Sequence, residues 1–264
     1  MTIWIDPPAW PAHDRLWSHL VSDVSVAELQ EFADRMGIPR RAFEGDHYDV
    51  PQERYADLVA AGARPTSAKD LVRRLRVSGL RVMKRHSDRL VTTTQEVTGP
   101  DGATMRVDLF TARLDPPERS TWGVAVFVAD AAGHQVAVRA VARDAWGPPS
   151  GLREPGEGVR EAACREVAEE CGLVLDPHEL QVVGYERLTF LDGRPHGRFP
   201  EPTVHVGVFQ ARALGVIPAL HPAAPDVDAA EWVSVAELER RCAEEFWWPL
   251  ADVVLPGFSR SSPA

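Results

Sequence analysis

The most constraining feature of the chain is residues 151–173, GLREPGEGVREAACREVAEECGL, a glutamate-rich stretch whose second half has the composition of a helix. At 100° per residue, three glutamates fall within about a third of the helix circumference: Glu166, Glu169 and Glu170. The opposite arc carries small apolar residues: Ala163, Cys164, Val167 and Cys171. The pattern therefore predicts a helix that packs one side under a sheet and presents carboxylates on the other.

The carboxylate face needs either solvent or a cation, because like charges one turn apart destabilise a helix. Oxygen ligands on a rigid element suit Mg²⁺ or Mn²⁺. Arg165 adjoins this face and could hold a glutamate through a bidentate contact. Gly151 and Gly156 free the backbone, so that a main-chain carbonyl could join the metal shell. A merely solvated helix is the alternative, and the charges alone do not decide between the two.

The spacing of the stretch is more specific than its charge. From Gly151 to Leu173 every defined position fits the pattern Gly-x5-Glu-x7-Arg-Glu-hydrophobic-x-Glu-Glu-x-Gly-hydrophobic, which is identified as the signature of the Nudix hydrolases. The resemblance covers roughly residues 90–258. It implies an α/β/α sandwich with a mixed sheet, and hydrolysis of a nucleoside diphosphate linked to another group.

The resemblance also implies roles for individual residues of the signature, which we call the box. It makes Glu169 and Glu170 the main ligands of Mg²⁺, with Mn²⁺ as an alternative ion, and Glu166 a third ligand or the general base. Arg165 would orient Glu166. Glu157 would support the metal shell and Gly151 would offer its carbonyl oxygen, so that a water activated by a carboxylate or the metal attacks one phosphorus in line.

The substrate is not specified by the box. Short tags that mark the NADH, coenzyme A, diadenosine polyphosphate and ADP-ribose branches are absent. The segment GRPHGRFPEPTVHVGVF, residues 193–209, offers three candidate substrate-binding side chains: Arg194, Arg198 and His205. It also holds Glu201, a general base that would compete with Glu166. For these loop charges simple solvation is the favoured reading, whereas Trp146 could equally stack on a base or pack.

Composition excludes several classes of function. The chain is 44% hydrophobic and 26% charged, which is typical of a globular protein. No run of about 18 apolar residues and no secretory signal occurs, so we expect no membrane association. Residues 1–88 hold 13 basic and 13 acidic residues and residues 89–264 hold 16 and 26, which makes nucleic-acid binding unlikely. Three cysteines without metal-type spacing favour reduced thiols in the cytoplasm.

The hydrophobic pattern divides the chain into two domains. Residues 1–86 predict a small α/β domain with helices at 25–36, 51–61 and 67–77, and the stretches resemble a small bacterial and phage domain family of unknown function. Residues 90–258 predict mostly strands around the acidic helix, with a loop at 143–151 and a second helix near residue 235. The fold class is therefore α/β, a Nudix α/β/α sandwich preceded by a small α/β domain.

The N-terminal domain concentrates histidines and aspartates in IDPPAWPAHDRLWSHLVSD, residues 5–23, and GDHYDVP, residues 45–51. They could bind a metal or phosphate, but helix caps and contacts within a small core are the favoured reading.

Two functions besides hydrolysis stay open. One is a Nudix-like module that senses a nucleotide derivative without turnover, although such modules often lose box glutamates that this chain keeps. The other is a bifunctional chain with a catalytic N-terminal domain. The expected partner is a small nucleoside diphosphate derivative, and a homodimer is possible.

Overall fold

The computed structural model describes residues 2–78, 80–81, 85, 87–99, 102–142, 144–197, 199–213 and 219–258. The chain divides into two compact units, residues 1–85 and 86–264. In the described part of the chain, no helix has the length and apolar character that crossing a bilayer requires.

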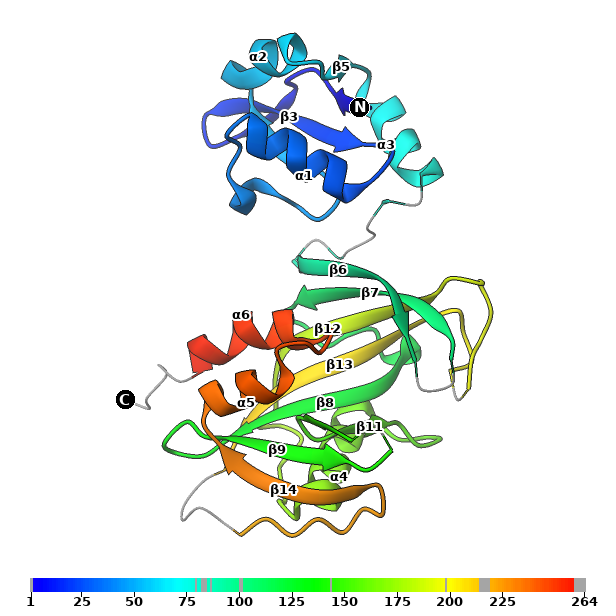
Figure 1. Cartoon of the computed structure of the whole chain (residues 1–264), viewed down its shortest axis with the longest axis vertical. Coiled ribbons are helices and arrows are strands. Elements are labelled where there is room, and N and C mark those ends of the chain that lie inside the picture. The colour runs from blue at the N-terminus through cyan, green and yellow to red at the C-terminus, as the bar shows by residue number, and fades with distance from the viewer. Residues whose placement is uncertain are drawn as a thin grey trace. The chain divides into compact units, whose positions relative to one another are not determined.

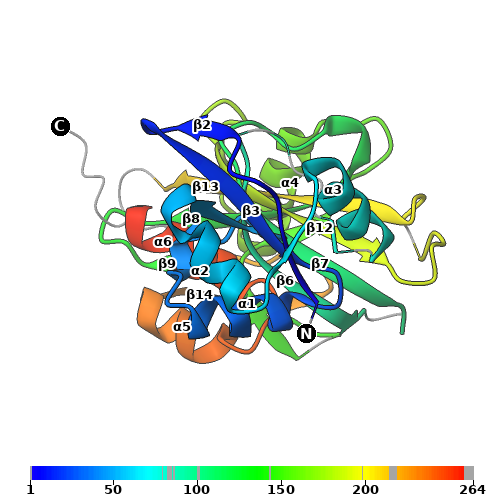
Figure 2. The ribbon, with the colours of Figure 1, turned by 90° about the horizontal axis from the view of Figure 1, so that it is seen from above.

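The first unit is a five-stranded sheet covered by helices on both faces (Figure 2). Its strands are β1 (Ile3–Ile5), β2 (Trp10–Ala12), β3 (Arg15–Ser22), β4 (Tyr48–Pro51) and β5 (Arg64–Pro65). Its helices are α1 (Val26–Arg35), α2 (Tyr55–Ala60) and α3 (Ala68–Val77), with two short 3₁₀ turns, η1 (Arg40–Ala42) and η2 (Gln52–Arg54). On β3, Leu20 packs in the α1 core while its neighbour Val21 packs under α3. Successive side chains of a strand point to opposite faces, which explains the two cores.

Local sequence signals determine where the helices of this unit begin and end. Ser25 caps α1 by accepting a hydrogen bond from the Glu28 amide at 3.1 Å, and Ser67 caps α3 in the same way. Gly37 follows α1 with φ of 63°, the left-handed conformation that ends many helices. The sequence also indicates a turn at Gly79, which lies outside the described residues.

The second unit is built on a nine-stranded mixed sheet (Figure 1). Its strands are β6 (Arg89–Thr98), β7 (Thr104–Thr111), β8 (Thr121–Ala129), β9 (Gln135–Ala140), β10 (Ala145–Gly147), β11 (Ser150–Leu152), β12 (Gln181–Phe190), β13 (Thr203–Arg212) and β14 (Val227–Val233). The central pair β13 and β8 is parallel and the other pairs are antiparallel. The main order is β10-β9-β8-β13-β12-β7-β6, with β11 beside β8 and β14 beside β9.

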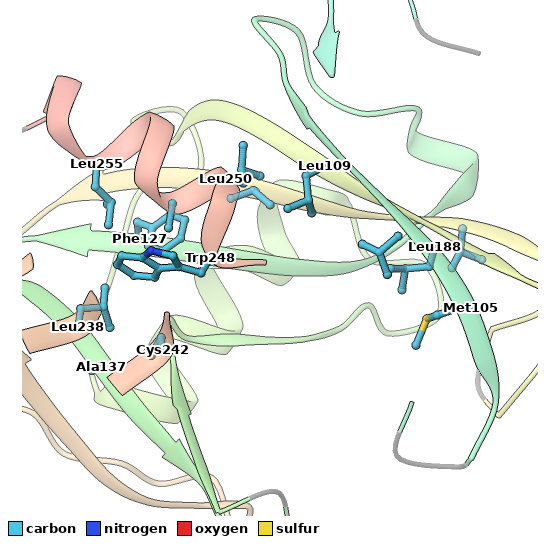
Figure 3. Close-up of a cluster of buried hydrophobic side chains, with 14 of the residues drawn as sticks. Met105, Leu109, Phe127, Ala137, Leu188, Leu238, Cys242, Trp248, Leu250 and Leu255 are labelled. Carbon is cyan, nitrogen blue, oxygen red and sulfur yellow. The ribbon is translucent and has the colours of Figure 1, made fainter. Parts of the chain in front are cut away.

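Helices cover both faces of this sheet. Val126 and Val128 of β8 pack under α4 (Val159–Cys171), whereas Phe127 points to the face covered by α5 (Val235–Cys242) and α6 (Trp248–Phe258). Figure 3 shows Trp248 and Leu255 of α6 over this second core. The predicted α/β/α sandwich with a mixed sheet is therefore confirmed. The loop predicted at 143–151 is wrong in one respect: it contains β10 and β11, because its backbone pairs with β9 and β8.

Candidate active site

The acidic helix is α4, and glycines adjoin both of its ends. The N-cap residue Gly158 donates its amide to Glu161 Oε2 at 2.9 Å, and Gly172 ends the helix with φ of 76°. The small residues of the opposite arc are buried as predicted, except Cys164, which is half-buried. Glu166 and Glu170 are buried as well, with exposed fractions of 8% and 5%. Buried carboxylates require partners, and the helix is therefore more than a solvated face.

Arg165 is the partner that gathers the box. Its Nε and Nη2 donate to the two oxygens of Glu157 at 2.8 and 3.0 Å, a bidentate pair. Its Nη1 donates to Glu166 Oε1 at 2.8 Å and to Glu169 Oε2 at 3.1 Å. Its Nη2 also reaches the carbonyl oxygen of Leu152 at 2.9 Å. One guanidinium thus joins three box glutamates to β11.

These contacts change the acidity of the groups. Burial alone would raise the pKa of the Glu157 carboxyl. The hydrogen bonds from Arg165 and from the Glu154 amide, together with the charges of Arg165 and Arg153, hold that pKa below its ordinary value. For Glu166 burial prevails, so its pKa is raised even though Arg165 offsets part of the effect. The hydrogen bond with Glu157 raises the pKa of Arg165, which stays charged.

Gly151 lies directly beneath the Glu166 carboxylate. A Cβ added at Gly151 would stand 2.1 Å from Glu166 Oε1, so that a side chain there would displace the Glu166 carboxylate. The preceding residue, Ser150, donates its amide to Glu170 Oε2 at 2.8 Å. Both contacts follow from the pairing of β11 with β8, which holds residues 150–152 against α4. The backbone of β11 therefore positions two box glutamates.

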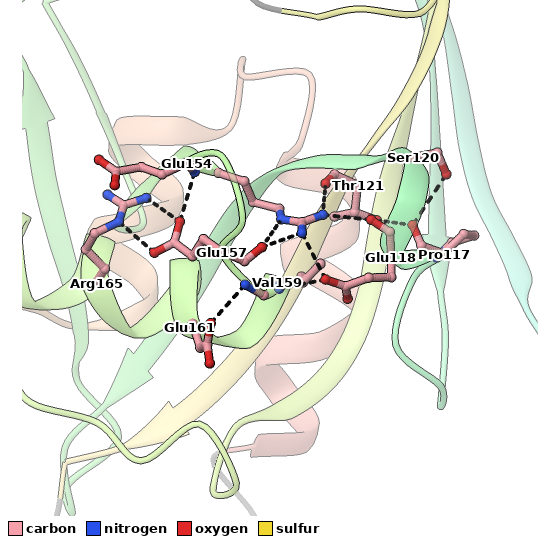
Figure 4. A network of polar contacts seen from close by, with 11 residues as sticks. Pro117, Glu118, Ser120, Thr121, Glu154, Glu157, Val159, Glu161 and Arg165 are labelled. Carbon is pink, nitrogen blue, oxygen red and sulfur yellow. Dashed lines mark hydrogen bonds and ion pairs between the residues drawn. The ribbon is translucent and has the colours of Figure 1, made fainter.

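The loop between β11 and α4 is anchored by a second arginine. Arg153 donates to the carbonyl oxygens of Glu118 and Thr121, each at 2.7 Å, and also to that of Glu157. Glu157 Oε2 in turn accepts the Glu154 amide at 2.9 Å. Figure 4 shows this network, in which Glu157 lies between Arg165 and the anchored loop. The loop is thereby held in the conformation that delivers Glu157 to Arg165.

The donors of the box fit a hard divalent cation. They are carboxylate oxygens and the backbone of a glycine, and Mg²⁺ and Mn²⁺ accept such ligands. In the part of the chain that the structure describes, ligand atoms of three box glutamates do not converge within 4.8 Å, since Arg165 lies between them. Glu169 has a half-exposed side chain.

A cavity of about 670 Å³ opens beside the box. Its wall includes Gly151 and Leu152, which touch Glu166 and Arg165 respectively. The remaining wall includes aromatic side chains: Phe127, Trp146, Phe199, Phe246 and Trp247. A largely apolar cavity of this size with a polar end is typical of a small-molecule site.

The cavity wall also includes a carboxylate that sequence reasoning missed. Glu186 on β12 is 7% exposed and shares its face of the strand with Gly184 and Leu188, which pack toward α6 and the core beneath it. An acidic residue at a core-facing position of a strand can indicate a functional site. This pattern alone does not place Glu186 in the cavity wall, because the register of β12 between β7 and β13 determines where Glu186 lies.

The remaining predicted residues are scattered. Trp146 lines the cavity, with the Arg241 guanidinium 4.2 Å from its ring centroid. Arg194 and Glu201 lie exposed between β12 and β13, and neither is among the described residues of the cavity wall. His205 alternates with Val206, which lines the cavity, and instead contacts Ser120 Oγ at 3.0 Å. Arg198 lies outside the described residues.

Comparison with solved structures finds proteins that are similar over about half of this chain. A pyrophosphohydrolase of Bacillus subtilis, BsRppH, is 21% identical over 53% of this chain and 75% of its own, with a TM-score of 0.38. An Ap4A hydrolase of C. elegans is 16% identical over 52% and 98%, also with a TM-score of 0.38. A bifunctional NMN adenylyltransferase/ADP ribose pyrophosphatase of Francisella tularensis is 20% identical over 55% and 43%, with a TM-score of 0.39. TM-scores this low say nothing about substrate.

Family models assign both parts of the sequence. Residues 3–78 match a family described as a protein of unknown function, DUF4031. No curated protein matches the chain. Residues 119–256, more than half of the 264 residues, match the NUDIX domain. The chain therefore belongs to the NUDIX family, as its box predicts.

Proposed function

We propose that residues 90–258 form a Mg²⁺-dependent pyrophosphohydrolase, a hydrolase that cleaves the diphosphate linkage of a nucleoside diphosphate derivative. The substrate class comprises nucleotides, nucleotide sugars and dinucleotides. The observation that carries the proposal is the meeting of box glutamates with a cavity wall at β11, where Gly151 contacts Glu166 and Ser150 binds Glu170. Mn²⁺ is the alternative ion.

Each box residue has a proposed task. Glu169 and Glu170 would hold the cation, with the Gly151 carbonyl oxygen as a further ligand and Glu157 in support, and Glu166 would serve as the general base. When bound, the cation would neutralise the diphosphate and lower the pKa of a water molecule. Arg165 would be a positioning residue, because it fixes the carboxylates without needing to reach the phosphates.

The general base is proposed to be Glu166 rather than Glu201. Glu166 adjoins the cavity wall through Gly151, and Arg165 orients its carboxylate. Glu201 lies exposed in the turn between β12 and β13 and is not among the described residues of the cavity wall. A base must lie within hydrogen-bond reach of the attacking water, directly or through one further water.

The nucleoside is proposed to occupy the aromatic part of the cavity. Trp146 offers a ring on which a base can stack, and Arg241 fixes that ring by lying 4.2 Å from its centroid. In this arrangement the diphosphate would reach the box at β11. Arg194, Arg198 and His205 have no assigned part in it.

A release screen tests the proposal. Purified protein with Mg²⁺ is offered deoxynucleoside triphosphates, nucleotide sugars, ADP-ribose, NADH and dinucleoside polyphosphates, and phosphate or nucleotide release is measured. We expect turnover of at least one class by the wild type and by Glu161→Gln, an exposed change on the same helix. Glu170→Gln should reduce that turnover by about 100-fold or more, because it removes a metal ligand.

Binding without turnover in the same screen would favour the ligand-sensing alternative.

The three cysteines are free thiols, which supports a reducing compartment such as the cytoplasm.

A further inference from the structure

The first unit contains a compact cluster of two imidazoles and a carboxylate. His19 of β3 stands directly opposite Asp49 of β4 in the antiparallel pair. His47 precedes Asp49 by two residues, so that strand alternation directs it to the same side. In the structure, ligand atoms of His19, His47 and Asp49 all lie within 4.8 Å of one another.

The distances suit ligands of a shared ion better than direct ion pairs. Asp49 Oδ1 lies 3.4 Å from His47 Nε2 and 3.8 Å from His19 Nε2. Charge-assisted hydrogen bonds are shorter, about 2.7–2.9 Å. Two ligand atoms that each lie about 2.1 Å from one ion are themselves about 3.0–3.5 Å apart. A small inward movement of His19 would complete such a shell.

Both imidazoles are oriented from behind by buried carboxylates. His19 Nδ1 contacts Asp6 Oδ2 at 2.9 Å, and His47 Nδ1 contacts Asp46 Oδ1 at 2.6 Å. Asp6 and Asp46 are 1% and 3% exposed. A carboxylate at the second ring nitrogen is the usual support of a metal-binding histidine. It keeps the proton on Nδ1 and leaves the lone pair of Nε2 available to the metal.

The supporting carboxylates are themselves fixed. Asp6 accepts the backbone amide of His19 at 2.5 Å and the indole Nε1 of Trp10 at 3.2 Å. Arg81 Nη1 approaches Asp46 Oδ2 at 3.3 Å. Two neighbouring polar residues lie outside the cluster: Asp23 accepts a hydrogen bond from Trp4 Nε1, and His13 lies exposed in the turn between β2 and β3. The cluster therefore contains only some of the histidines and aspartates of this unit.

The ligand groups also face solvent. The side chains of His47, His19 and Asp49 are 16%, 25% and 42% exposed, and the half-exposed Trp10 ring packs edge-on against His19 at 5.2 Å. Three protein ligands on an open face leave coordination positions for water or another small ligand. Nitrogen donors favour first-row transition metals over Mg²⁺.

We propose that His19, His47 and Asp49 bind a divalent first-row transition metal such as Zn²⁺, with Asp6 and Asp46 as positioning residues. The sequence alone favoured helix caps and core contacts for these groups. The site is independent of the box, since every residue of it belongs to residues 1–85.

Titration of the full chain with Co²⁺ tests the site, because Co²⁺ bound to nitrogen and oxygen ligands absorbs visible light. The chain carries Glu170→Gln, and excess Mg²⁺ is present, so that the box does not compete. We expect one equivalent of Co²⁺ to bind and Zn²⁺ to displace it. His47→Gln should weaken binding at least about 100-fold, whereas His13→Asn, an exposed change that suits the positive φ of residue 13, should leave it unchanged.

Absence of binding, equal binding by His47→Gln, or equal weakening by His13→Asn would overturn the proposal. X-ray absorption of the Zn²⁺-loaded protein without the His47 change gives a second test that does not depend on the folding of a variant. Two imidazole ligands are expected there. A shell with one imidazole or none would equally overturn the proposal.

Discussion

In the second unit a guanidinium holds carboxylates together, whereas in the first unit carboxylates hold imidazoles. Arg165 contacts Glu157, Glu166 and Glu169. In the first unit, Asp6 and Asp46 orient His19 and His47. Both arrangements fix ligand groups before any ion arrives. The donor atoms differ, and with them the class of ion that each proposed centre would select.

The two centres also differ in how the chain brings them together. The box is nearly continuous in sequence, and the helical period alone gathers three of its glutamates, Glu166, Glu169 and Glu170. The cluster in the first unit depends on the pairing of β3 with β4, which sets His19 opposite Asp49. A site on one helix can therefore be predicted from residue spacing alone. A site across two strands can be predicted only when the register of those strands is known.

The largest expected effect is that of Gly151→Ala. The new Cβ would stand 2.1 Å from Glu166 Oε1 and displace a carboxylate that the box requires. We expect turnover to fall by roughly 100-fold or more, since small misplacements of catalytic groups cost that much. Steady-state kinetics with Gly158→Ala as control measures it: that Cβ meets only the exposed Glu161, at 3.3 Å. Similar turnover by both variants would show that the approach of β11 to Glu166 is not needed.

Arg165→Lys should come next. Lysine keeps the charge but cannot reproduce the fork that serves Glu157 and Glu166 together. We expect kcat to fall about 10- to 100-fold and the Mg²⁺ concentration for half-maximal activity to rise. Arg160→Lys is the matched control, because Arg160 is also on α4 and makes a bidentate pair with Asp115, which is not part of the box. An equal loss in both variants would mean that only helix stability is at stake.

The supporting carboxylate of the first unit gives a comparable test. Asp46→Asn leaves His47 in place but weakens the contact to its Nδ1, now 2.6 Å long. We expect Co²⁺ affinity to fall about tenfold, in the range seen for outer-shell partners of metal ligands. Competition titration with a chelator of known affinity measures the change. Undiminished affinity would make Asp46 a structural partner only.

The smallest effects concern helix caps, one in each unit. Ser25 accepts the Glu28 amide and Ser234 accepts the Glu237 amide, each at 3.1 Å. Replacing either serine by alanine should lower the free energy of unfolding by about 1 kcal/mol. If the compact units unfold separately, calorimetry will show the two variants shifting different transitions. A single transition shifted equally by both variants would show that the two units unfold together as one cooperative body.

Much of the fold was predictable because its signals are local. The caps at Ser25 and Ser67, the hairpin of β6 and β7, and the dry face of α4 all follow from short patterns. The strands β10 and β11 were missed because their partners, β9 and β8, determine them rather than their own residues.

The site divides in the same way. The sequence indicates that Arg165 adjoins Glu166, Glu169 and Glu170, because all four lie within two turns of one helix. The contact of Arg165 with Glu157 depends instead on the loop before α4. The sequence does not reveal Glu186 or Trp247 in the cavity wall, since strand register and the connection before α6 bring them there. Chain proximity to a loop also misleads for His205, because it alternates with Val206 and thus leaves the cavity face.

The central claim is that the box hydrolyses a diphosphate, and labelling with ¹⁸O water tests it most directly. The best substrate of the release screen is hydrolysed with Mg²⁺ in H₂¹⁸O, and the masses of the products are measured by mass spectrometry. The account predicts one ¹⁸O atom in one of the two phosphate-containing products for wild type and Glu161→Gln, with formation of that product nearly abolished in Glu170→Gln. Unlabelled products, or labelled product formed equally fast by Glu170→Gln, would contradict it.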